Sequence, residues 1–109
     1  MLAPQIEWRE ADNFIYADGN PYVGPDAVLH GVFLRLATEW DGFAATPQQF
    51  FDAGETVIVT GRYTGAYKAT GKSIDAQFAH CYTLAGGKVT RFQQYADTLQ
   101  VARSAGISL

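Results

Sequence analysis

The sequence predicts an α+β fold in which a curved antiparallel sheet wraps around a helix. From residue 48 to residue 96, apolar and polar side chains alternate with the period of two that is typical of strands. Residues 25–40 instead repeat their apolar side chains at helical spacing. The chain has 109 residues, of which 48% are hydrophobic, so it forms one domain at most and can bury a real core.

The first half of the chain is predicted to contain one strand and one helix. Residues 6–11 alternate as a short strand, and residues 18–21 form a turn. Pro25 fits the first position of a helix, where Asp26 complements the positive end of the helix dipole. Asp41-Gly42 is expected to end this helix. Its apolar stripe consists of Leu29, Val32, Phe33, Leu36 and Trp40.

The second half is predicted to be a meander of strands followed by a short helix. A hairpin turn at residues 53–55 precedes strands at residues 56–67, 73–84 and 88–96, and Gly86-Gly87 is a hairpin signal between the last two. Gly61 and Gly65 indicate a bent strand or a closely approached backbone. The terminal helix starts after Asp97 and ends at Gly106, a glycine suited to a left-handed cap.

Composition and charge exclude several classes of function. The net charge is −3, which disfavours nucleic acid, and the lone Cys81 cannot form an internal disulfide. There is no signal sequence and no apolar run long enough to cross a membrane, so we expect a cytoplasmic protein. Residues 1–55 hold nine acids and two bases, whereas residues 56–109 hold two acids and six bases. This asymmetry fits an acidic helical half on a basic sheet, or a basic patch for an anionic substrate.

His80 is the first candidate for chemistry because it lies on the apolar face of its strand, between Phe78 and Tyr82. A buried neutral imidazole can serve as acid, base or hydrogen-bond donor near neutral pH. The same pattern also fits a core histidine whose hydrogen bonds are satisfied by a neighbour. No metal ligand set is expected, since neither histidine has ligand-like spacing to carboxylates or to Cys81.

Asp97, at the end of the last strand, is the second candidate. It is a good N-cap with Gln100 at the third helical position, and it could also be a carboxylate at the mouth of the sheet with a raised pKa. Gln93 and Tyr95 share its face, together with Arg91, and this face is too polar for an ordinary core. It therefore faces solvent, a dimer contact or a pocket.

Aromatic side chains make up 14% of the sequence and could serve as core or as pocket walls. There is no phosphate-binding loop, dinucleotide fingerprint or nucleophile-elbow serine, and no cofactor is expected. The residues expected to hold a small apolar molecule are Trp8, Phe33, Trp40, Tyr63, Phe78 and Gln93.

Several segments, in order and over nearly the whole chain, resemble the SnoaL-like polyketide cyclase and ketosteroid isomerase-like group of the nuclear transport factor 2-like superfamily. The matching segments are residues 6–8, 22–28, 56–63, 70–72, 78–80, 87–89 and 92–98. Phe33, Leu36 and Trp40, which lie between the second and the third of these segments, match as well. The resemblance implies a single domain over residues 1–109, without the helix or helices that usually come first in the family. It also implies a cone-shaped barrel and a homodimer through the outer sheet face, the side of Ile58, Arg62 and Cys81.

Members of known activity transfer protons on carbonyl compounds or open epoxides without cofactors, and their strand histidine and terminal-strand aspartate correspond to His80 and Asp97. On this basis His80 or Asp97 would move a proton next to a carbonyl, and Tyr95 would donate a hydrogen bond to the developing oxyanion. A non-catalytic binding module and a pure interaction domain are the alternative readings, because a fold does not establish an activity.

Overall fold

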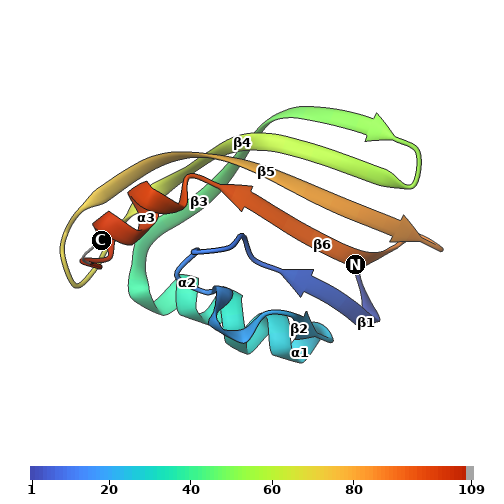
Figure 1. The fold of residues 1–109 in the computed structure, drawn as a ribbon, viewed down its shortest axis with the longest axis horizontal. Helices are drawn as coiled ribbons and strands as arrows, with labels where there is room; N and C mark the ends of the chain where they lie inside the picture. The colour runs from blue at the N-terminus through green and yellow to red at the C-terminus, as the bar shows by residue number, and fades with distance from the viewer. Residues whose placement is uncertain (108–109) are drawn as a thin grey trace.

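The computed structural model describes residues 1–107 and contains one six-stranded sheet (Figure 1). The strands are β1 (Leu2–Arg9), β2 (Tyr22–Val23), β3 (Trp40–Ala53), β4 (Thr56–Tyr67), β5 (Ser73–Ala85) and β6 (Lys88–Ala96). The helical segments are a 3-10 turn (Ala17–Gly19), α1 (Pro25–Val28), a π-helical turn (Leu29–Phe33), α2 (Leu34–Glu39) and α3 (Thr98–Ser104). Within residues 1–107, no helix is long and apolar enough to span a membrane.

The sheet is mixed, which corrects the expectation of a purely antiparallel one. Its order is β2-β1-β6-β5-β4-β3, and β1 pairs parallel with β6 while the other neighbours pair antiparallel. The parallel pair arises because the chain crosses from β1 through the helix to the far edge and meanders back. The sheet arches without closing into a barrel, and Figure 1 shows the α1–α2 segment beneath the arch.

The helix ends earlier than the sequence predicted. Trp40 has the apolar spacing of the helical stripe, but its backbone is extended (φ −121°, ψ 147°), and Trp40 is the first residue of β3. It pairs with Tyr67 of β4, and its indole donates to the Tyr16 hydroxyl at 3.0 Å. Strand pairing and this buried hydrogen bond therefore outweigh helical periodicity. As a result β3 begins eight residues before the predicted change to period two at residue 48.

Gly61 confirms the prediction of a closely approached backbone. It lies opposite Pro47 of β3, next to an irregularity in the register between Pro47 and Gln49. A Cβ at position 61 would lie 2.1 Å from the carbonyl oxygen of Thr46. Only glycine at position 61 therefore allows β3 to lie this close to β4. The close approach helps the pair of strands bend over the core.

Among residues 1–107, two clusters of buried side chains form the core. One joins β4 and β5 to the segment after β1 and to α3, and it includes Phe14, Tyr16, Trp40, Phe78 and Val101. The other joins β1, β6 and the helix, and it consists of Ile6, Trp8, Tyr22, Val28, Val32 and Phe92. Both clusters lie on the concave face of the sheet, so the space between them is where a cavity can form.

The terminal helix α3 starts as predicted. The Asp97 carboxylate accepts a hydrogen bond from the Gln100 backbone N–H at 3.1 Å, and the Gln100 side chain donates to the same carboxylate. At the other end, Gly106 has a φ of +80° and closes the helix as the expected left-handed cap. Asp97 is therefore a structural N-cap in this fold.

We expect Asp97→Ala to lower the free energy of unfolding by about 1 kcal/mol, because the first turn of α3 loses its cap. Asp97→Asn is the matched control, since asparagine caps helices about as well as aspartate. Urea unfolding of both variants checks this prediction. Equal stability of the two variants would contradict a capping role for the Asp97 side chain.

Candidate active site

A cavity of about 210 Å³ lies between the concave face of the sheet and the helix. Its walls come from β1, the π-helical turn, α2, β3, β4, β5 and β6, and most of the lining residues are apolar. The apolar and aromatic lining consists of Trp8, Phe14, Val32, Phe33, Leu36, Phe43, Ala45, Tyr63, Tyr82 and Phe92. The remaining lining residues are Glu10, His80 and Gln94. A small ligand in this space would meet aromatic rings and a few polar groups at fixed positions.

A chain of hydrogen bonds crosses the sheet along one wall of this cavity. The Ala11 backbone N–H donates to Gln94 Oε1 at 3.0 Å, and Gln94 Nε2 donates to the Tyr63 hydroxyl at 2.9 Å. The Tyr63 hydroxyl contacts His80 Nε2, and His80 Nδ1 lies 3.2 Å from the Tyr82 hydroxyl. The segment after β1 and the strands β4, β5 and β6 thus contribute polar groups to one connected hydrogen-bond network.

His80 lies at the centre of this set and is neutral at pH 7. Its ring stacks on Phe78 with centroids 4.2 Å apart and meets Phe92 edge to face at 4.8 Å. Burial among these rings lowers the pKa of His80 to about 4. A neutral imidazole has one N–H donor and one acceptor nitrogen, so His80 can relay a hydrogen bond but does not bring a positive charge.

Glu10 brings a carboxyl group to the cavity, and it is only 3% exposed. Burial raises its pKa from 4.5 to about 7, although a hydrogen bond from the Trp8 indole at 3.3 Å and the charge of Arg35 both oppose the rise. A carboxyl group with this pKa exchanges its proton readily at neutral pH. Glu10 therefore has the property required of a general base or acid.

The backbone around Glu10 is fixed by Asn20. The Glu10 backbone N–H donates to Asn20 Oδ1 at 2.9 Å, and Asn20 Nδ2 returns a hydrogen bond to the Glu10 carbonyl at 2.8 Å. These reciprocal bonds hold the end of β1 against the turn that leads into β2. The Glu10 side chain consequently has a defined position relative to the cavity.

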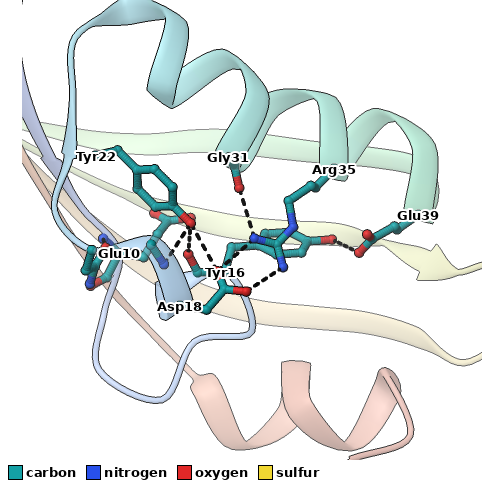
Figure 2. A network of polar contacts seen from close by, with 9 residues as sticks. Glu10, Tyr16, Asp18, Tyr22, Gly31, Arg35 and Glu39 are labelled. Carbon is teal, nitrogen blue, oxygen red and sulfur yellow. Dashed lines mark hydrogen bonds and ion pairs between the residues drawn. The ribbon is translucent and has the colours of Figure 1, made fainter.

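A polar network then joins this turn to the helix, as Figure 2 shows. Arg35 binds both carboxylate oxygens of Asp18, at 2.8 and 3.1 Å, and its guanidinium lies 4.2 Å from the centre of the Tyr16 ring. The hydroxyl of Tyr22 donates to the Tyr16 carbonyl at 2.6 Å, and the Tyr16 hydroxyl donates to Glu39 at 2.7 Å. The network ties the segment after Glu10 to the helix that forms the opposite wall.

The structure brings together only part of the site that the sequence predicted. His80, Trp8, Phe33 and Tyr63 line the cavity. Trp40 and Phe78 are buried beside it without lining it, since Trp40 packs against Tyr67 and Phe78 stacks between Tyr63 and His80.

The prediction that Asp97 and Tyr95 face one cavity with His80 is wrong. Gln94, and not its neighbours, points inward on β6, where it pairs with His80 of β5. Gln93 and Tyr95 consequently lie on the outer face, and Tyr95 is 57% exposed. Asp97 caps α3 beyond the end of β6 and does not line the cavity either. Phe92, on the opposite face of β6 from Gln93 and Tyr95, is buried in the core, so the polar face of β6 points outward.

Glu10, Gln94 and the role of Tyr82 were not predicted from the sequence. The signal for Glu10 was present, because Ile6, Trp8 and Glu10 follow one another at intervals of two and are all buried, with Glu10 directly after the end of β1. The signal for Gln94 was its spacing of two from Phe92. In both cases a polar residue in a row of buried apolar ones marked the site.

The chain belongs to the SnoaL-like domain family, whose model matches residues 1–92. No curated protein matches the chain. An NTF2-like protein from Burkholderia thailandensis E264 is 43% identical and superposes with a TM-score of 0.90 over 94% of this chain and 78% of that one. An NTF2-like protein from Burkholderia xenovorans LB400 is 30% identical, with a TM-score of 0.80 over 95% and 77%.

More distant solved structures share the fold alone. A candidate SnoaL-like polyketide cyclase from Jannaschia sp. CCS1 has 16% identity and a TM-score of 0.82, over 99% of this chain and 75% of that one. These comparisons agree with the curved sheet and the helix beneath it, and they confirm the fold and the family that the sequence motifs indicated.

Proposed function

We propose that this protein is an enzyme that moves a proton on a small, neutral, apolar carbonyl compound without a cofactor, as an isomerase or cyclase does. The observation that carries the proposal is the carboxyl group of Glu10, which lies in an aromatic cavity with a pKa of about 7. Catalytic bases work best when their pKa lies near the operating pH. The fold relation to a candidate polyketide cyclase supports the same class of chemistry.

The reaction follows from the groups in the cavity. The Glu10 carboxylate takes a proton from the carbon next to the carbonyl. The electron pair of that C–H bond forms a carbon–carbon double bond, and the π pair of the C=O bond moves to the oxygen, which gives an enolate. Protonated Glu10 then returns the proton to the same carbon or to another one. The hydrogen bond from Trp8 holds one carboxylate oxygen in place, which leaves the other oxygen for the substrate.

The experiment that tests this function is deuterium exchange at the α-carbon of cyclohexanone and 2-indanone in D₂O, followed by proton NMR. We expect wild-type protein to accelerate exchange and Glu10→Gln to lower the rate by about 10² to 10⁴, the usual contribution of general acid–base catalysis. Glu7→Gln is the matched control, because Glu7 lies on β1 just before Glu10 but pairs with Arg9 on the protein surface.

Two outcomes would contradict the proposal. Exchange that is equally fast in Glu10→Gln and wild type would show that Glu10 is not the base. Ketone that binds in the cavity but does not exchange with wild-type protein would instead favour a ligand-binding module.

Charge selectivity is a further expectation of this site. Among residues 1–107, no lysine or arginine lines the cavity, His80 is neutral, and Glu10 is partly ionised at pH 7. A carboxylate ligand would therefore lose its hydration without gaining a charge partner. We expect cyclohexanone to bind at least tenfold more tightly than cyclohexanecarboxylate at pH 8, as measured by NMR titration. Equal affinity would show that a cation reaches the ligand.

A further inference from the structure

Each hydrogen bond in the chain along the cavity wall has a defined donor and acceptor. The first bond, from the Ala11 backbone N–H, fixes these roles for the bonds that follow. A backbone N–H can only donate, so the atom of Gln94 that faces the Ala11 N–H is the amide oxygen. The other end of the same amide is then its NH₂ group, which must donate to the Tyr63 hydroxyl. Gln94 is 4% exposed, so solvent does not offer it an alternative partner.

The next two bonds follow from this one. Tyr63 accepts from Gln94, and among residues 1–107 the acceptor within reach of its own proton is His80 Nε2. If Nε2 accepts, the proton of the neutral ring lies on Nδ1. Nδ1 then donates to the Tyr82 hydroxyl, 3.2 Å away. Tyr82 is the last member of the chain, and within residues 1–107 its hydroxyl proton has no acceptor.

Building on the proposed function, we propose that Tyr82 is the catalytic hydrogen-bond donor to the substrate carbonyl oxygen, and that Gln94 is the positioning residue that sets the direction of the chain. Tyr82 lines the cavity that also contains Glu10, so a ketone can lie between the two. Because Tyr82 accepts from His80, its hydroxyl is free to donate, and each bond behind it polarises the next. The enolate oxygen then receives a donor where its charge develops.

The first test measures the ring proton of His80 by ¹⁵N NMR at pH 7, with His30→Gln used to assign the two histidines. We expect one neutral tautomer with the proton on Nδ1. In Gln94→Met, which lacks the amide donor, we expect a mixture of tautomers. A proton on Nε2 in the wild type would overturn the proposal, since Tyr82 would then donate to His80 and not to the substrate. A single Nδ1 tautomer in Gln94→Met would overturn the positioning role of Gln94.

The second test uses cyclohexanone labelled with ¹³C at the carbonyl as a probe in difference infrared spectroscopy. We expect the carbonyl band of the bound probe at a lower frequency in wild type than in Tyr82→Phe. Exchange in Tyr82→Phe should be slower by about 10²-fold in kcat with little change in KM. A carbonyl band that is the same in both proteins would overturn the proposal. Neither the tautomer nor the band requires turnover, so an inactive protein that shows both would refute the proposed function and leave the donor role of Tyr82 standing.

Discussion

Glu10→Gln is expected to stabilise the protein above pH 7 while it removes α-proton exchange. The reason is that the wild-type protein must bury a carboxylate at high pH, whereas glutamine is neutral at every pH and can still accept the hydrogen bond from Trp8. A pKa raised from 4.5 to about 7 corresponds to a stability difference of about 3 kcal/mol once the group is ionised in both states.

The direction of the pH dependence is fixed by this shift. Because the pKa of Glu10 is higher in the folded state, its contribution to stability is fully present below pH 4.5 and is lost as the pH rises through about 7. The gain in Glu10→Gln should therefore be near zero at pH 4.5 and largest above pH 8. Urea unfolding at several pH values measures it, with Glu7→Gln as a control that shows no such trend. A difference in the free energy of unfolding between Glu10→Gln and wild type that does not change with pH would contradict the raised pKa of Glu10.

His80 should act in the opposite direction. Burial lowers its pKa from 6.5 to about 4, so its contribution to stability is present above pH 6.5 and is lost as the pH falls toward 4. Between pH 4.5 and 6.5 the two groups oppose each other, which predicts a broad region of nearly constant stability for the wild type.

Gly61→Ala is expected to lower the free energy of unfolding by about 3 kcal/mol or to prevent folding. The added methyl group would meet the Thr46 carbonyl oxygen at 2.1 Å and the Phe78 ring at 2.8 Å. Since the Thr46 carbonyl oxygen belongs to the backbone of β3, it cannot move away without breaking the pairing between β3 and β4. Thermal and urea unfolding measure the loss.

The control for this variant is Gly54→Ala in the hairpin turn. Gly54 has a φ of +79°, but in the part of the chain that the structure describes no atom lies within 4 Å of an added Cβ. Its substitution should cost only the strain of the backbone conformation, about 1 kcal/mol. Equal losses in the two variants would show that close approach at Gly61 is not what requires glycine there.

The fold could be predicted from the sequence because its signals are local. The alternation in residues 56–67 and 73–84, the turn at Gly86-Gly87 and the cap at Asp97 are each set by a few neighbouring residues. The end of the helix at Glu39 could not be predicted, because Trp40 is extended through contacts with Tyr67 and Tyr16, which are distant in sequence. The parallel pairing of β1 with β6 depends on the same kind of distant contact.

The site was harder to predict because it depends on which way each strand faces. The segment around Asp97 contains a carboxylate that could form a catalytic pair with His80. In the observed register of β6, however, Phe92 and Gln94 point inward, which places Tyr95 on the outer face. Glu10 lies in a sequence pattern that by itself indicates only a strand. Its importance comes from burial beneath the helix, a property of the packed fold, although its period of two with Trp8 was visible.

The role of Glu10 as the base of a proton-transfer enzyme is tested most directly by the pH profile of α-proton exchange in 2-indanone. We expect the rate catalysed by wild-type protein, after subtraction of the solvent rate, to rise with pH and level off above an apparent pKa of about 7. The profile should disappear in Glu10→Gln and remain in Glu7→Gln. A catalysed rate that is independent of pH between 5 and 9, or one that Glu10→Gln retains, would contradict the claim.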